Sequence, residues 1–292
     1  MTVLEREQVA EHHAWCPPPL LRHAVDHYTG YRYAGFEPGR HMGLPSRHLT
    51  FIISFDQPLD LTMVVDGRRT SSTFDAVVSG FHTAPAVIRH DGSQHGIQLH
   101  VTPPGARRLF DVPAGDLASD AVPLDALWGP LAAELRDRLD AAPTWRDRFT
   151  VLDAMLLRVV ASRPLGAPTA RAEATEAFRR LIVTDGLIDI SSLADHVGWS
   201  RRHLSGEFAA EYGVSPKQMA RVLRFDRSRS RLVAPDAGSM ASIAAECGYA
   251  DQAHMAREWR ALAGASPSQW LAAERLPLVV EEWPEEPASA SR

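Results

Sequence analysis

The C-terminal third of the sequence repeats itself, and this repeat constrains the fold more than any other feature. Residues 193–199 (LADHVGW) match residues 243–249 (IAAECGY) at an offset of 50 positions, and the match then resumes at an offset of 51. The later pairs are Ser200 with Asp251, His203 with His254, Leu204 with Met255, Glu207 with Glu258, Phe208 with Trp259, Gly213 with Gly264, and Ser215-Pro216 with Ser266-Pro267. Because so many like-for-like pairs are hard to obtain by chance, we expect both segments to form the same supersecondary unit.

Each copy carries the start and stop signals of a helix-turn-helix. A short helix ends in a Gly-aromatic turn, and Ser200 or Asp251 then stands at the N-cap position of a second helix. Gly213 or Gly264 marks the end of that second helix, and the Ser-Pro pair that follows suits the start of another. We therefore predict two helix-turn-helix units. Their second helices are predicted over 201–209 and 252–262.

The spacing of apolar residues decides which faces of these second helices are free to bind. Leu204 and Phe208 lie four positions apart and must form the buried stripe of the first one. The opposite faces carry Arg201, Arg202, Ser205 and Gly206 in the first copy and Gln252, Ala253, Ala256 and Arg257 in the second. Arg can bond bidentately to guanine and Gln to adenine in the major groove, so these faces suit base recognition in DNA.

A further helix, predicted from Pro216 to about Leu232, joins the two units. At 1.5 Å per residue it is a rigid spacer of roughly 24 Å, which can set the second helices near the ~34 Å between successive major grooves on one face of a duplex. Its arginines are Arg221, Arg224, Arg227, Arg229 and Arg231. Because they point around the helix, we expect only some of them to reach phosphate.

The net charge of the whole chain hides a basic segment. The chain has 31 Lys plus Arg against 36 Asp plus Glu, a formal net charge of −5. Residues 196–231 nevertheless hold eight basic side chains against three acidic ones. Residues 277–292 contain four Glu among Pro, Ala and Ser, a composition that predicts a disordered acidic tail. The charge distribution is therefore compatible with a nucleic-acid partner.

At the repeated residues the chain resembles a known family. Residues 193–216 (LADHVGWSRRHLSGEFAAEYGVSP) and 243–267 (IAAECGYADQAHMAREWRALAGASP) are similar to the double helix-turn-helix domain of AraC/XylS-type transcription regulators, over about residues 175–272. The resemblance implies an all-α module that binds two adjacent major grooves of double-stranded DNA. It implies DNA contacts from Arg201, Arg202, Ser205, Gly206, Gln252, Ala253 and Arg257. Family members often carry Arg where this chain has Gly206, so the first helix departs from the pattern there.

The N-terminal half has the pattern of a small β-rich domain. Strands are predicted over 48–55, 59–65, 75–79, 86–90 and 96–101. Asp91-Gly92 favours a hairpin turn before the last strand, in which apolar and polar residues alternate. Helices are predicted over 127–139 and 145–160, where apolar residues recur every three or four positions. This half is similar to the β-rich, often cupin-like sensor or dimerisation domains that precede the AraC/XylS-type module.

These patterns predict an α+β chain of two domains. Residues 1–162 are expected to form a β-rich, cupin-like sensor or dimerisation domain with a helical coupling segment at 125–162. Residues 163–170 have the Pro, Gly and small residues of a linker. Residues 171–276 are expected to form the all-α double helix-turn-helix domain, and 277–292 the acidic tail.

Histidines and aromatic residues are numerous in the N-terminal half. The histidines are His48, His82, His90, His95 and His100, and the aromatic residues include Trp15, Tyr28, Tyr31, Tyr33, Phe36, Phe51 and Phe55. No carboxylate completes a convincing ligand set with the histidines, so we expect solvated or hydrogen-bonding imidazoles, no metal and no cofactor. Most of the aromatic residues are expected in the core rather than in a ligand pocket.

The sequence thus predicts a sequence-specific DNA-binding transcription regulator, an activator or a repressor, modulated through its N-terminal domain by a small-molecule effector or a partner. It is not expected to be an enzyme. RNA polymerase and a second copy of the chain are candidate partners, and the effector is not identified. We expect a cytoplasmic protein, because no apolar run reaches the ~18 residues of a membrane span and the N-terminus lacks the apolar core of a secretory signal. Two alternatives stay open: a cupin-type metalloenzyme fused to a DNA-targeting module, and an N-terminal half that serves dimerisation alone.

Overall fold

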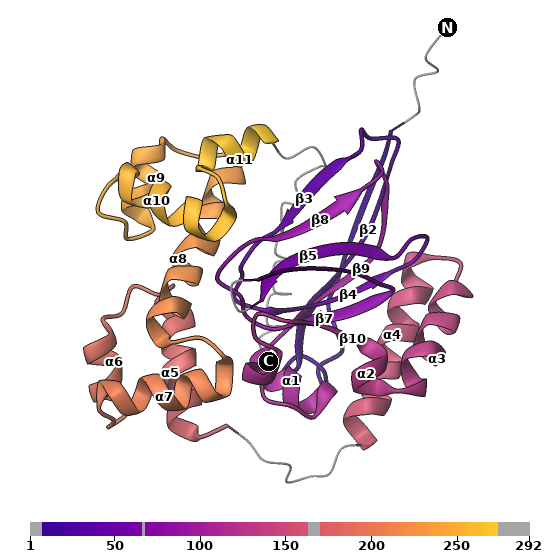
Figure 1. Ribbon diagram of the computed structural model, residues 1–292. Helices are drawn as coiled ribbons and strands as arrows, with labels where there is room; N and C mark the ends of the chain where they lie inside the picture. Colours follow the sequence, from indigo (N-terminus) through magenta and orange to yellow (C-terminus); the bar gives the residue numbers. More distant parts are fainter. Residues whose placement is uncertain (1–7, 66–67, 163–169, 274–292) are drawn as a thin grey trace, which may run out of the picture.

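The computed structural model describes residues 8–65, 68–162 and 170–273, and shows a β-rich part followed by a helical part (Figure 1). The predicted fold class is confirmed. Nearly all of the predicted linker and the whole predicted acidic tail lie outside the described residues. Across the described residues, no helix has the length and apolar character needed to cross a membrane.

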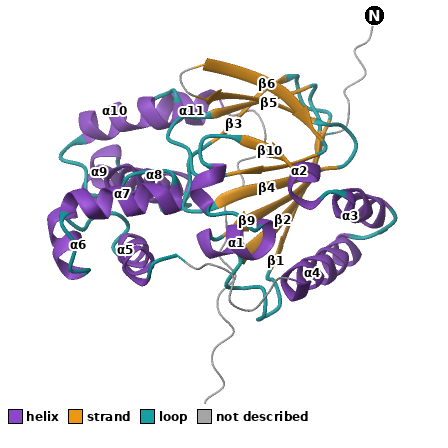
Figure 2. Ribbon diagram, turned by 60° about the horizontal axis from the view of Figure 1, so that its bottom comes forward, coloured by secondary structure: helices purple, strands orange, loops and turns teal. Residues whose placement is uncertain are grey.

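The strands are β1 (Val9–Trp15), β2 (Val25–Ala34), β3 (Gly39–Gly43), β4 (Leu49–Ser54), β5 (Leu59–Val65), β6 (Arg68–Phe74), β7 (Ala76–Ser79), β8 (Ala86–His90), β9 (Gln94–Val101) and β10 (Ala121–Pro123). They form a six-stranded sheet in the order β1-β2-β9-β4-β7-β10 and a four-stranded sheet in the order β3-β8-β5-β6. Neighbouring strands run antiparallel in both sheets. Figure 2 shows the two sheets facing each other.

The predicted hairpin at Asp91-Gly92 is wrong. The strand before it, β8, pairs with β3 and β5, whereas the strand after it, β9, pairs with β2 and β4. The turn therefore carries the chain from one sheet to the other, and the backbone oxygen of Gly92 accepts a hydrogen bond from the Phe36 amide at 3.1 Å. The strands β1, β2, β3, β6 and β10 were not among those predicted.

The two faces of the six-stranded sheet differ in chemistry because side chains alternate along each strand. On one face Tyr28, Phe51, Ile97 and Leu99 are fully buried in the main core. Helix α4 (Trp145–Ser162) covers this face, and Phe149 of α4 stacks on Tyr28. The opposite face carries polar side chains and looks toward the four-stranded sheet.

The remaining helices are α1 (Pro103–Phe110), η1 (Ala114–Leu117), α2 (Leu124–Trp128), α3 (Pro130–Asp140), α5 (Ala172–Val183), α6 (Ile190–His196), α7 (Arg201–Tyr212), α8 (Pro216–Val233), α9 (Met240–Glu246), α10 (Gln252–Ala263) and α11 (Pro267–Ala273). The predicted caps of α7 and α10 are confirmed. Ser200 accepts from the His203 amide at 3.2 Å and Asp251 from the His254 amide at 2.6 Å. Gly213 and Gly264 end these helices at φ of 72° and 73°.

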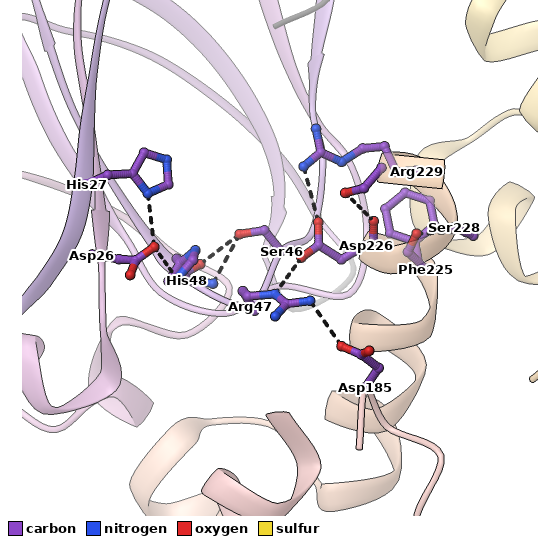
Figure 3. Close-up of polar contacts among 11 residues, drawn as sticks. Asp26, His27, Ser46, Arg47, His48, Asp185, Phe225, Asp226, Ser228 and Arg229 are labelled. Atoms are coloured by element: carbon purple, nitrogen blue, oxygen red, sulfur yellow. Dashed lines mark hydrogen bonds and ion pairs between the residues drawn. The ribbon is translucent and has the colours of Figure 1, made fainter. Parts of the chain in front are cut away.

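Ion pairs join the β-rich part to the helical part. Arg107 of α1 donates through Nε and a terminal nitrogen to Glu211 of α7, at 3.0 and 2.6 Å. Arg47, between β3 and β4, donates to Asp226 of α8 at 3.1 Å and to Asp185 at 3.3 Å (Figure 3). These contacts position the first helix-turn-helix unit and the spacer helix against the sheets.

Histidines gather beside Arg47. The rings of His27 and His100 stack with centroids 3.9 Å apart, and His48 packs edge-on against His100 at 5.5 Å. Asp26 lies 3.0 Å from His27 and 3.5 Å from His48. Burial lowers the pKa of His48 to about 4, although Asp26 and Asp226 act to raise it. Burial likewise lowers the pKa of His100 well below its ordinary value.

The contact between α7 and η1 predicts unequal effects for two equivalent glycine substitutions. A Cβ on Gly213 would collide with the Ala118 side chain, whereas one on Gly264 would, among the described residues, meet Pro85 alone, at 3.6 Å. Both alanine variants should lose roughly 1–2 kcal/mol of unfolding free energy, because alanine is unfavourable in the left-handed conformation. Gly213→Ala should lose about 1–3 kcal/mol more, from the collision. Denaturant unfolding of both variants measures this difference, and equal losses would mean that α7 does not dock on this segment in solution.

The neutral histidines predict that stability falls in acid. The unfolded chain protonates His48 near pH 6.5, whereas the folded chain does so near pH 4, so acidification favours the unfolded chain across this window. His48 accounts for about 3 kcal/mol of the loss, and His100 adds to it. His48→Gln removes one titrating group and should reduce the loss of unfolding free energy between neutral pH and pH 4. An unchanged loss would contradict the burial of a neutral His48.

Candidate nucleic-acid interface

Helices α7 and α10 present the side chains predicted to read bases. Their buried stripes are Leu204 with Phe208 and Met255 with Trp259, as the apolar spacing indicates. Of the predicted site residues, Arg201, Arg202, Gly206, Gln252, Ala253 and Arg257 are exposed and Ser205 is half-buried. The side chains of Arg202, Gln252 and Arg257 form no hydrogen bond or ion pair with other described residues. Each helix thus offers a guanidinium or amide group to an external acceptor.

Each of these two helices forms an ion pair with an arginine from a helix earlier in the chain. Arg171, at the N-cap of α5, pairs with Glu207 of α7 at 2.9 Å. Arg221 of α8 pairs with Glu258 of α10 at 2.9 Å. The two arginines are 50 positions apart and the two glutamates 51, so the internal repeat includes this ion pair. The sequence pairs the glutamates across the repeat, but it does not show that they share a function.

The arginines of α8 are engaged within the protein, and the prediction that some of them reach phosphate stays a prediction. Besides Arg221, Arg224 donates to the Gly186 carbonyl at 3.1 Å and Arg227 to Asp185 at 3.0 Å. Arg229 donates to Asp226 at 3.1 Å and Arg231 to Glu246 at 3.0 Å. The basic segment therefore holds the helical part together and adds less free positive charge than its composition suggests.

Gly206 lies in an ordinary helical turn with open space around it. Its φ is outside the left-handed region, and a Cβ built on it would have no neighbouring heavy atom within 4 Å. No packing within the described residues therefore requires glycine at this position. A requirement for glycine here would have to come from a molecule that lies against α7.

A cavity of about 190 Å³ lies between the two sheets and reaches the helical part. One wall belongs to the six-stranded sheet and is mainly polar: Thr29, Tyr31, Tyr33, Thr50, Ser79, Gln94, Gln98 and His100, together with the apolar Ile52 and Val77. The facing wall is apolar and belongs mainly to the four-stranded sheet: Met42, Leu59, Leu61, Met63, Ala86 and Ile88. Arg229 and Val233 of α8 and Trp270 of α11 belong to the lining as well. Tyr31 and Tyr33 therefore line a pocket, whereas Tyr28 and Phe51 lie in the core as expected.

The histidines considered in the sequence form contacts within the β-rich part. His82 bonds the Ala84 carbonyl at 2.6 Å, His90 accepts from the Gly92 amide at 3.2 Å, and His95 bonds Asp56 at 2.9 Å. His82 and His100 also line the cavity. Among the described residues, no three His, Cys, Asp or Glu side chains form a group that could hold a metal ion.

Known proteins resemble both parts of the chain. A family profile described as a helix-turn-helix domain matches residues 193–273. ToxT from Vibrio cholerae is similar in structure, with 13% identity, 84% of this chain and 96% of that chain covered, and a TM-score of 0.51. The DNA-binding domain of AdpA, solved with a target DNA, matches at 24% identity over 35% of this chain and 91% of its own, with a TM-score of 0.32. The AraC-like transcriptional activator CuxR matches at 16% identity over 66% of this chain and 74% of its own, with a TM-score of 0.30.

Among curated protein sequences, none matches this chain significantly. The family match covers both repeat copies, from the first residue of the repeat to the last residue of α11. The likeness to ToxT extends to the β-rich part and supports the fold of the whole chain. Residues 193–273 are therefore a double helix-turn-helix domain of the AraC type, joined to a β-rich part in the fold seen in ToxT.

Proposed function

We propose that this chain is a transcription regulator that binds a specific DNA sequence through α7 and α10, each in one of two adjacent major grooves. The observation that carries the proposal is the pair of repeat-related helices whose exposed faces hold Arg202, Gln252 and Arg257. Arg and Gln are the side chains that recognise guanine and adenine by paired hydrogen bonds. Arg201, Ser205, Gly206 and Ala253 lie on the same faces and complete the proposed interface.

The ion pairs Arg171–Glu207 and Arg221–Glu258 support base reading, because they fix the rotation of each helix about its axis. Glu258 is next to Arg257, and its half-buried carboxylate is held by Arg221. Glu207 is next to Gly206 and is held by Arg171. A recognition side chain must be positioned to within about 0.5 Å of its productive geometry, so an ion pair at the neighbouring residue improves specificity.

We further propose that a small molecule in the cavity modulates DNA binding. The cavity is lined by both sheets and by α8 and α11, so a bound molecule would contact the DNA-binding part directly. An N-terminal half that served dimerisation alone would leave this cavity without a use. Contacts with RNA polymerase or with a second copy of the chain stay predictions, as does the division into domains at residues 163–170.

Base reading by the second helix predicts a sequence-dependent loss for Arg257→Ala. With a DNA site selected from random sequence by the full chain, the variant should bind about 1–3 kcal/mol more weakly and lose preference at one base pair. Arg231→Ala is the matched control, since Arg231 pairs with Glu246 and Asp236 within the protein, and it should leave DNA affinity unchanged. Titrations on the selected site and on random DNA decide the question. Equal losses of affinity for the selected site and for random DNA would mean that Arg257 binds phosphate instead of a base.

Gly206→Ala tests whether α7 approaches DNA closely. The variant should be more stable by roughly 0.5–1 kcal/mol, because glycine is unfavourable within a helix and the added methyl group meets no neighbour. If the backbone of α7 lies against the groove, the same methyl group should weaken binding to the selected site. Thermal unfolding and DNA titration of one preparation give both values. Greater stability with unchanged DNA affinity would show that this position is not read.

A further inference from the structure

The cavity wall that belongs to the six-stranded sheet carries polar side chains that have no hydrogen-bond partner in the described protein. The side chains of Thr29, Tyr31, Thr50, Gln94 and Gln98 line the cavity, and they form no hydrogen bond with other described residues. Thr29 is only 5% exposed. A buried polar group is unfavourable when it lacks a partner, so this wall suits a molecule that supplies hydrogen-bonding groups of its own.

The strand register places two of these polar groups side by side. Gln98 of β9 lies opposite Thr29 of β2 and, on its other side, opposite Ile52 of β4. All three residues line the cavity. Tyr28, the neighbour of Thr29, packs in the main core, so the alternation of side chains along β2 directs Thr29 toward the four-stranded sheet. A hydroxyl and an amide therefore lie next to each other on one wall of the cavity.

The charges of the lining favour an uncharged ligand. Among the described residues that line the cavity, none is a carboxylate and Arg229 is the one arginine. Arg229 already donates to Asp226, at 3.1 Å. Burial lowers the pKa of His100 and raises the pKa of Tyr31, so both side chains are neutral at physiological pH. A ligand ammonium group would find no counter-charge there, and a ligand carboxylate would have to compete with Asp226 for Arg229.

The glutamine indicates which uncharged group is complementary to this wall. A glutamine side chain presents an N–H donor and a carbonyl acceptor in one plane. Primary carboxamides and lactams hold their own N–H and C=O on the same side of the C–N bond, so one such group can form two parallel hydrogen bonds with Gln98. The adjacent Thr29 hydroxyl can donate or accept a third. An alcohol offers a single oxygen and uses less of this capacity.

The facing wall accounts for the remainder of a ligand. Leu59, Leu61 and Ile88 of the four-stranded sheet are buried and line the cavity. The cavity volume of about 190 Å³ lies below the roughly 300–1,000 Å³ of pockets that hold drug-sized ligands. A compact apolar skeleton with an amide at one edge is therefore complementary to the two walls.

We propose that the cavity binds a small uncharged amide, a carboxamide or a lactam, whose amide group bonds to Gln98 and Thr29 and whose apolar skeleton lies against the four-stranded sheet. This inference rests on the proposed function, in which the cavity is the effector site. It gives that effector a chemical class.

The test compares matched probes on the full chain without DNA, so that its outcome is independent of DNA binding. Cinnamamide, cinnamate, cinnamyl alcohol and cinnamylamine share one apolar skeleton and differ in the polar group. With binding followed by ligand-observed NMR, cinnamamide should bind more than tenfold more tightly than each of the other three. The compact lactam 2-quinolinone should displace cinnamamide from the same site.

Two substitutions remove the proposed partners with little change in size. Thr29→Val and Gln98→Leu should each weaken cinnamamide binding about tenfold. Because neither side chain bonds to other described residues, both variants should unfold at the same temperature as the unsubstituted chain or at a higher one. Thr70→Val is the matched control, since Thr70 is exposed on β6 and outside the lining, and it should keep cinnamamide binding.

Several outcomes would overturn the proposal: tighter binding of the acid, alcohol or amine than of the amide, binding of none of the probes, or amide binding that either substitution leaves unchanged. A lower unfolding temperature of both variants would also overturn it, since the two side chains would then hold the sheet together. Loss of DNA binding by the full chain, with amide binding intact, would instead overturn the proposed function.

Discussion

One buried carboxylate, that of Asp226, connects the parts of this protein. Its side chain is 9% exposed, and it accepts from Arg47 of the β-rich part and from Arg229 of its own helix. Burial would raise the pKa of Asp226, but the two arginines outweigh burial and hold the pKa below its ordinary value. A buried charge costs several kcal/mol unless partners offset it, so the ionised carboxylate requires both parts of the chain in place.

The consequence is a spacer helix whose position depends on the β-rich part. Asp226 lies midway along α8, which separates the two helix-turn-helix units. Glu211, held by Arg107, fixes the far end of α7, while Trp270 beside the cavity belongs to the second unit. The β-rich part therefore contacts both units. A molecule in the cavity would act where these contacts converge.

Local signals allowed the helical part to be predicted closely. Ser200, Asp251, Gly213 and Gly264 act on their own helices through neighbouring amides, so sequence alone identifies these boundaries. The exposed faces of α7 and α10 could be predicted as well, because the spacing of apolar residues within each helix identifies its buried face. The helices extend a residue or more beyond the predicted ends, to Tyr212 and Ala263.

What the sequence did not reveal depends on contacts between distant residues. The turn at Asp91-Gly92 has hairpin residues, yet the pairing of β8 with β3 and β5 decides its geometry. The arginines of α8 have the composition of a phosphate-binding patch, but their partners lie elsewhere in the chain, at Asp185, Gly186, Glu246 and Glu258. The cavity likewise combines strands with α8 and α11, which no local pattern brings together.

The central claim is that the duplicated units read two successive major grooves. Chemical interference mapping of guanine and adenine contacts, on a DNA site selected by the full chain, tests it most directly. The account predicts two clusters of major-groove contacts about 10 base pairs apart on one face of the duplex. A single cluster, or two clusters on opposite faces, would contradict it.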